Sequence, residues 1–175
     1  MPAPRAPLHP RLAALGLQRL DCLAFDLDGT LWDSTAGVAQ AWSQVLRDRL
    51  PHRPLLTAAD FAGVMGLPHQ PMVERLFPDL EPAQRESLVA ACYAREEALL
   101  RAQGGQLYPQ ARAVVQQLAE YFPLLIVSNC QRGYIEAFLD WSGLAPCFLD
   151  WECHGNTGLT KGQNLRRLLA RTGLA

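Results

Sequence analysis

The chain has 175 residues, 49 % of them hydrophobic and 19 % charged, which is typical of a globular protein with one hydrophobic core. Its formal net charge of −1, with scattered basic residues, gives no electrostatic case for a nucleic-acid or membrane partner. No stretch approaches the roughly 18 apolar residues of a membrane span. Five cysteines, spread singly, fit reduced thiols better than a disulfide framework, so the expected location is cytoplasmic.

The first half of the chain reads as one strand followed by a helical block. An apolar run at residues 22–25 stops at the sequence D-L-D-G-T (26–30), as a buried parallel strand does when it feeds a loop. From residue 34 to 105 the apolar spacing is helical, and no convincing strand occurs. Pro82 begins the longest predicted helix, and the glycines at 104–105 end it. Residues 34–105 are therefore interpreted as a helical insertion.

The second half of the chain alternates helices and strands. The predicted elements are, in order, a helix at 111–118, a buried strand at 123–127, a helix at 133–141, a strand near 147–151 and a helix at 162–171. This alternation, with polar residues where strands end, is typical of a doubly wound (Rossmann-like) α/β fold with a parallel sheet. The predicted core comprises residues 1–33 and 106–175, interrupted by the helical insertion 34–105.

The strongest chemical signal is the pair Asp26 and Asp28 at the end of the first predicted strand. Two carboxylates two residues apart on an extended chain point the same way, and their repulsion is relieved by a cation or a shared proton. A Mg²⁺ ion held by both aspartates would provide that relief. Asp26 is then a candidate nucleophile toward phosphorus, and Asp28 a candidate acid that protonates the leaving oxygen and later activates water.

The stretch at 25–31, F-D-L-D-G-T-L, resembles the first motif of the haloacid dehalogenase-like hydrolase superfamily. The resemblance implies that Asp26 is the nucleophile, that Asp28 is the general acid and base, and that the helical insertion is the superfamily's cap. Dehalogenase members lack the second aspartate, so its presence implies phosphate chemistry. The stretch at 152–158, E-C-H-G-N-T-G, resembles a loop of phosphoglycolate-phosphatase-like members.

Ser128 and Asn129 follow the second predicted strand of the core. A hydroxyl and backbone N–H groups at such a strand end can hold a phosphoryl oxygen, although turn capping alone also explains a Ser-Asn pair. The pair lies about where the superfamily's second motif is expected, so the resemblance implies that Ser128 binds phosphate, with Asn129 as a weaker candidate.

Lys161 is the third candidate phosphate-binding site. Thr160 and Gln163 predict a capping box that places Lys161 at the first position of the last helix. A cation is unfavourable beside the positive end of a helix dipole, which points to a function for this lysine. Balancing the charge of the two aspartates and a phosphoryl group is such a function. A surface lysine with no role is the alternative.

The superfamily's fourth motif, an acidic pair on a further strand, does not follow Lys161. Asp140, Asp150 and Glu152 all precede Lys161 and lack the apolar strand that introduces the motif. The missing strand normally pairs beside the nucleophile strand, which is therefore expected at a sheet edge, where association is a hazard. A shortened reading frame, a homo-oligomer that covers the edge, and residues 1–20 folding across it are three explanations that the sequence leaves open.

These observations predict Mg²⁺-dependent hydrolysis of a small phosphomonoester through an aspartyl-phosphate on Asp26. The expected partner is a small phosphorylated metabolite, with phosphoglycolate suggested first by the resemblance. A phosphosugar mutase is an alternative within the class. A truncated or non-catalytic module that binds a phosphorylated ligand or a protein is the alternative from another class, because the fourth motif is missing.

Overall fold

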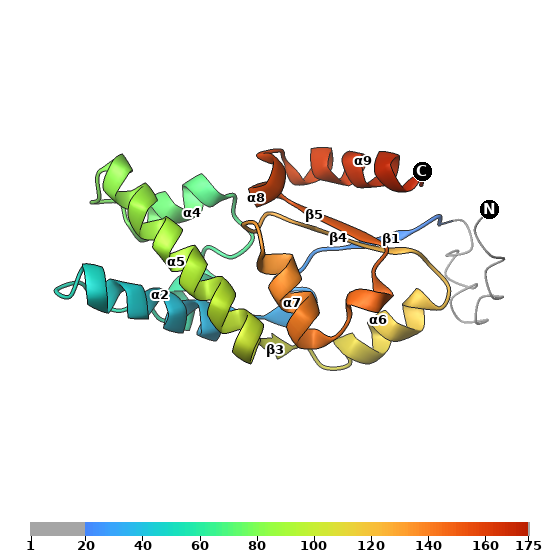
Figure 1. Cartoon of the computed structure of the whole chain (residues 1–175), viewed down its shortest axis with the longest axis horizontal. Helices are drawn as coiled ribbons and strands as arrows, with labels where there is room; N and C mark the ends of the chain where they lie inside the picture. Colours follow the sequence, from blue (N-terminus) through green and yellow to red (C-terminus); the bar gives the residue numbers. More distant parts are fainter. Residues whose placement is uncertain (1–19, 175) are drawn as a thin grey trace.

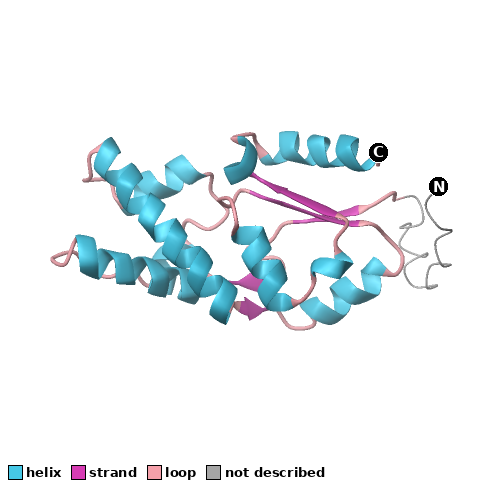
Figure 2. Ribbon diagram, in the orientation of Figure 1, coloured by secondary structure: helices cyan, strands magenta, loops and turns pink. Residues whose placement is uncertain are grey.

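A computed structural model describes residues 20–174 and has a parallel three-stranded sheet between two layers of helices (Figures 1 and 2). The strand order is β1-β4-β5, with β1 at Leu23–Phe25, β4 at Leu124–Ser128 and β5 at Asp150–Cys153. The predicted doubly wound α/β fold is therefore confirmed. The strand predicted near 147–151 begins later, because Ala145–Cys147 form a 3-10 turn, η2, with proline at a position that favours a helical start.

Strand β4 is buried along its whole length because helices cover both of its faces. Leu124 and Ile126 face the main core, on the side of the sheet where Figure 1 shows α6 (Ala111–Ala119) and α7 (Tyr134–Ser142). Leu125 and Val127 point the other way and pack with Leu168 of α9 (Lys161–Thr172). Alternate side chains of a strand point to opposite faces, so a strand covered on both sides reads as a continuous apolar run.

A helical segment comprising α2 to α5 lies at the carboxyl end of the sheet, as Figure 1 shows. Its helices are α2 (Thr35–Arg49), α3 (Ala58–Ala62), α4 (His69–Leu76) and α5 (Pro82–Gln103). At its centre, the buried Trp42 ring contacts Phe61, Phe77 and Tyr93 at centroid distances of 5.2, 6.1 and 5.6 Å. Aromatic packing of this kind stabilises the α2–α5 segment, and Trp42, Phe61 and Phe77 belong to the same hydrophobic core as Leu124 and Ile126 of β4.

The chain enters and leaves the α2–α5 segment through neighbouring strands. β2 (Trp32–Asp33) and β3 (Gln106–Leu107) form an antiparallel pair at its base. Next to this pair, Gly104 has a φ of 71°, and a Cβ there would lie 1.8 Å from a ring atom of Trp141. An ion pair between Arg101 of α5 and Asp140 of α7 lies on the same side. The end of α5 is therefore held directly against α7.

Strand β1 lies at an edge of the described sheet, as expected, since within residues 20–174 it pairs with β4 alone. The suggestion that residues 1–20 cover this edge falls almost entirely on residues 1–19, which lie outside the described part. All five cysteines are free thiols, in agreement with the sequence. In the described part of the chain, no helix combines the length and the apolar character that crossing a membrane requires.

Candidate active site

The predicted site residues Asp26, Asp28, Ser128 and Lys161 lie where β1 and β4 end and where α9 begins. Parallel strands bring their carboxyl ends to one edge of a sheet, which is where doubly wound folds bind ligands. A cavity of about 40 Å³ opens there, between the sheet and the α2–α5 segment. Its lining includes both aspartates, Ser128 and Asn129, together with apolar side chains of the helical segment.

The Asp26 carboxylate is held by contacts to both of its oxygens. Oδ2 lies 2.7 Å from Nζ of Lys161, and Oδ1 accepts a hydrogen bond of 2.8 Å from the backbone N–H of Leu27. The side chains of Asp26 and Lys161 are each about one-third exposed, at 37 % and 34 %. The structure thus brings the first and third sequence motifs into direct contact, 135 residues apart, and leaves the carboxylate accessible to a ligand.

Asp28 differs from Asp26 because its carboxylate is turned into a polar cluster. Its Oδ1 accepts hydrogen bonds from Tyr134 OH at 2.6 Å, Trp32 Nε1 at 3.1 Å and Ser34 Oγ at 3.2 Å. Burial raises the pKa of Asp28 to about 6, and these three hydrogen bonds offset part of the rise because they favour the charged form. A carboxyl with a pKa near neutrality can both donate and accept a proton.

Ser128 and Asn129 lie beside the aspartates, with different orientations. Ser128 is 3 % exposed, and its Oγ accepts a hydrogen bond of 3.3 Å from the backbone N–H of Cys130. The Asn129 side chain reaches to the helical segment, where its Nδ2 donates to the carbonyl oxygen of Gly66 at 3.0 Å. Asn129 therefore links the strand end to the α2–α5 segment, and the phosphate-binding roles of both residues stay predictions.

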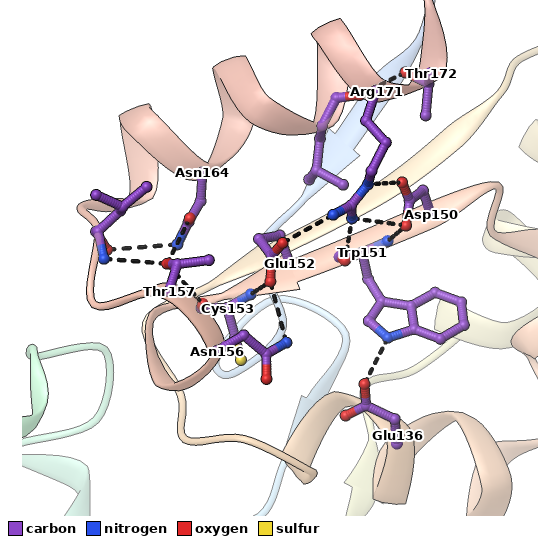
Figure 3. Close-up of polar contacts among 12 residues, drawn as sticks. Glu136, Asp150, Trp151, Glu152, Cys153, Asn156, Thr157, Asn164, Arg171 and Thr172 are labelled. Atoms are coloured by element: carbon purple, nitrogen blue, oxygen red, sulfur yellow. Dashed lines mark hydrogen bonds and ion pairs between the residues drawn. The ribbon is translucent and has the colours of Figure 1, made fainter.

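Lys161 is positioned by the cap of its helix and by the anchoring of α9. The predicted capping box of Thr160 and Gln163 is confirmed, with Lys161 as the first residue of α9. Near the other end of α9, Arg171 forms ion pairs with Asp150 at 2.6 Å and Glu152 at 3.0 Å (Figure 3). Two bonds from one guanidinium fix direction as well as distance. The Arg171 contacts thus fix the orientation of α9, the helix that carries Lys161, relative to β5.

Glu152 is engaged in this structural network. It is 4 % exposed and also accepts hydrogen bonds from Asn156 Nδ2 at 3.1 Å and its neighbour Cys153 N at 3.2 Å (Figure 3). Asn156 belongs to the short helix α8 (His154–Thr157), which connects β5 to α9. Arg171 and two further donors surround the Glu152 carboxylate, so these structural contacts account for the presence of a buried glutamate at this position.

We expect Arg171→Met to lower the free energy of unfolding by about 2 kcal/mol, because it leaves the buried Glu152 without a cation, with allowance for the exposure of Arg171. Urea unfolding at pH 7 measures the change. Adding Glu152→Gln to this variant should restore part of the loss. Arg166→Met, at an exposed position of the same helix, is the matched control. A double variant no more stable than Arg171→Met would contradict the ion-pair explanation.

Sequence reasoning missed a buried glutamate, Glu96, in the wall of the cavity. Glu96 lies on α5, is 2 % exposed, and accepts hydrogen bonds from Trp42 Nε1 on Oε2 and from Gln131 Nε2 on Oε1. Burial raises its pKa to about 8, partly offset by these two donors. In the sequence, Glu96 sits in a helical stretch rich in charged residues, so nothing distinguished it from an exposed glutamate. Tyr134 was missed because its contact with Asp28 joins residues 106 positions apart in the chain.

The carboxylates of the site are compatible with Mg²⁺. Within residues 20–174 no group of three or more His, Cys, Asp or Glu side chains converges as a metal-binding cluster. Mg²⁺ commonly keeps several waters and is held by one or two carboxylates together with substrate phosphate oxygens. Asp26 and Asp28 supply a donor set of that kind. Their side chains therefore fit this ion, with the remaining positions left to water and ligand.

A family model described as haloacid dehalogenase-like hydrolase matches residues 20–173. The chain belongs to this hydrolase family. Two curated relatives are phosphoglycolate phosphatases: one from Xanthomonas campestris is 34 % identical over 96 residues, and one from Yersinia pseudotuberculosis is 31 % identical over 132 residues. The matched regions cover 55 % and 72 % of this chain, but only 42 % and 55 % of those proteins, so the chain spans about half the length of these relatives.

Solved structures of the haloacid dehalogenase-like family share the fold. The family protein SP0104 from Streptococcus pneumoniae has a TM-score of 0.74 at 22 % identity, covering 89 % of this chain and 71 % of that one. A phosphoglycolate phosphatase predicted in Haemophilus somnus also has a TM-score of 0.74, at 18 % identity, with coverages of 89 % and 72 %. The Bacillus subtilis hydrolase YfnB, solved with magnesium, has a TM-score of 0.63 at 24 % identity, with coverages of 87 % and 74 %.

Proposed function

We propose that this protein is a Mg²⁺-dependent phosphatase that hydrolyses a small phosphomonoester through a covalent intermediate on Asp26. The observation that carries the proposal is the contact of 2.7 Å between Asp26 and Lys161, beside a second carboxyl whose pKa is close to neutrality. A nucleophile, a cation for the phosphoryl charge and a proton donor then lie together at the carboxyl end of the sheet.

In the first step, an oxygen of the Asp26 carboxylate attacks phosphorus, and the bond between phosphorus and the leaving oxygen breaks. Asp28, in its protonated form, gives its proton to that oxygen, so the alcohol leaves uncharged. Lys161 and the Ser128 region would hold the non-bridging phosphoryl oxygens during this transfer. Asn129 is proposed to orient the same group once its contact with Gly66 is released.

In the second step, water attacks the phosphorus of the aspartyl-phosphate. Asp28, now ionised, takes a proton from the water, the bond between phosphorus and the Asp26 oxygen breaks, and inorganic phosphate forms. Mg²⁺, held by Asp26 and Asp28, would supply charge neutralisation for the phosphoryl oxygens throughout. Tyr134 and Ser34 keep the Asp28 carboxyl oriented in the cavity between the two steps.

We also propose that the α2–α5 segment acts as a cap, with boundaries near residues 34 and 105, over a core formed by residues 1–33 and 106–175. The antiparallel pairing of β2 with β3 supports these boundaries, since it closes the base of the segment. Closing such a segment over a site excludes bulk water from a reactive intermediate. The magnesium-bound YfnB structure is described as revealing interdomain movement in that protein. A cytoplasmic location is part of the same proposal.

The test is phosphate release from a panel of small phosphomonoesters, phosphoglycolate included, with and without Mg²⁺. We expect turnover that depends on Mg²⁺ and stops when the ion is chelated. The alternative is a non-catalytic module that binds a phosphorylated ligand; it is favoured because no third acidic side chain within residues 20–174 is placed to share a metal ion with Asp26 and Asp28. A folded chain that releases no phosphate from any ester, yet binds one of them in calorimetry, would favour that alternative.

A further inference from the structure

The cavity beside the aspartates has an uneven charge distribution. Its lining includes three carboxyl groups, those of Asp26, Asp28 and Glu96, and no lysine or arginine among the described residues. His69 is the basic side chain of the lining; burial lowers its pKa, and its Nδ1 lies 2.6 Å from Tyr93 OH. The part of the cavity away from Lys161 is thus acidic and apolar.

Basic side chains do occur nearby, but they line a different groove. Arg132 and His154 line an adjoining groove that shares His69, Tyr93 and residues 129–131 with the cavity, but neither Asp26 nor Asp28 contributes to that groove. The leaving oxygen of a substrate must reach Asp28 to receive its proton. The leaving group therefore belongs in the acidic cavity, where it meets Glu96 instead of Arg132.

Glu96 is held in a fixed orientation in this cavity. Trp42 Nε1 and Gln131 Nε2 each donate to a different oxygen of its carboxyl group. Each oxygen of Glu96 has a further position for a hydrogen bond, and the proton that the folded chain keeps below about pH 8 makes the group a donor as well as an acceptor toward a ligand. A hydroxyl group is matched to such a partner, whereas a carboxylate there would lose its water without gaining a cation.

Resting on the proposed phosphatase function, we propose that Glu96 is a specificity-determining residue that selects phosphomonoesters with an uncharged, hydroxylated leaving group over carboxylated ones. The substrate class is thus small polyol phosphates. The cavity volume of about 40 Å³ holds roughly three waters at about 10–15 Å³ each. The leaving group that fits such a space is small.

Three esters with the same three-carbon skeleton test the proposal: glycerol 3-phosphate, 3-phosphoglycerate and propyl phosphate. We expect kcat/KM for glycerol 3-phosphate to exceed that for 3-phosphoglycerate by about tenfold or more, the size of one well-made hydrogen bond or one uncompensated buried charge. Equal values, or a preference for 3-phosphoglycerate that Arg132→Ala removes, would overturn the proposal. Phosphate release from any of the three esters still supports the phosphatase function, so the two failures are distinguishable.

Variants of Glu96 separate specificity from stability. Glu96→Met should lower kcat/KM about tenfold for glycerol 3-phosphate and leave propyl phosphate, which has no hydroxyl for Glu96, within about twofold. Glu96→Gln keeps an acceptor oxygen and should retain most of the preference. If Glu96→Met lowered kcat/KM equally for glycerol 3-phosphate and propyl phosphate, the defect would be structural and the proposal would be overturned. The binding affinity measured by calorimetry must also be higher for glycerol 3-phosphate than for 3-phosphoglycerate, which tests the inference even without turnover. A lack of binding of glycerol 3-phosphate would overturn it.

Discussion

Asparagine in place of Asp26 is expected to abolish Mg²⁺-dependent phosphate release, with a loss of at least about 10³-fold in kcat. The amide has nearly the shape of the carboxylate but lacks the charge that attacks phosphorus. The variant also replaces the ion pair with Lys161 by a neutral contact. Phosphate release under saturating ester measures the loss, and urea unfolding checks that the variant is folded.

Asp33→Asn is the matched control for this substitution. Asp33 is exposed, and its Oδ1 accepts hydrogen bonds from the backbone N–H and the hydroxyl of Thr35, at 2.9 and 2.7 Å. An asparagine oxygen accepts the same bonds, so activity should stay within about twofold of the original. A folded Asp26→Asn protein with activity close to that of Asp33→Asn would place the nucleophile elsewhere.

The stability of the protein is expected to fall as pH rises from about 5 to 8. Burial raises the pKa of Glu96 to about 8 and that of Asp28 to about 6, both above their ordinary values near 4. Between about pH 4 and pH 8 the folded chain therefore binds more protons than the unfolded chain. The contribution of these two protonated carboxyl groups to the free energy of unfolding is complete below about pH 4, and it is lost as the pH rises through their pKa values in the folded chain. For Glu96 the loss is on the order of 3 kcal/mol.

Urea unfolding at pH 5, 6.5 and 8 measures this slope, and Glu96→Gln should flatten it because an amide does not titrate. Glu120→Gln is the control, since Glu120 is exposed at the end of α6. A slope unchanged in Glu96→Gln would mean that Glu96 is not the group responsible. A rise in stability from pH 5 to pH 8 would contradict the raised pKa values altogether.

Local signals account for what the sequence predicted well. An apolar run that ends at Asp26 marks β1, and a capping box of Thr160 and Gln163 marks the start of α9. Because parallel strands end at one edge, the convergence of Asp26 and Asp28 with Ser128 also followed from the predicted fold, whereas the placement of Lys161 at this site rested on the resemblance. Such features depend on neighbours in the chain or on a general rule of topology.

The features that sequence reasoning missed depend on contacts between distant residues. Tyr134 donates to Asp28 across 106 positions, and Trp42 donates to Glu96 across 54. No local pattern distinguishes a glutamate that faces a cavity from one that faces solvent, since both positions recur with the same helical period. The orientation of Asn129 toward Gly66 likewise depends on how the α2–α5 segment lies against the sheet.

The two sides of the α2–α5 segment are attached to the rest of the chain with unequal strength. On one side, α5 is held by the Arg101–Asp140 ion pair and by the close approach of Gly104 to the Trp141 ring. On the other, the loop that contains Gly66 contacts the core through the hydrogen bond of 3.0 Å from Asn129 to Gly66, which contributes about 1 kcal/mol. If the segment opens as proposed, the hydrogen bond from Asn129 to Gly66 would break while the end of α5 stays against α7. Ligands would then enter and leave past Gly66.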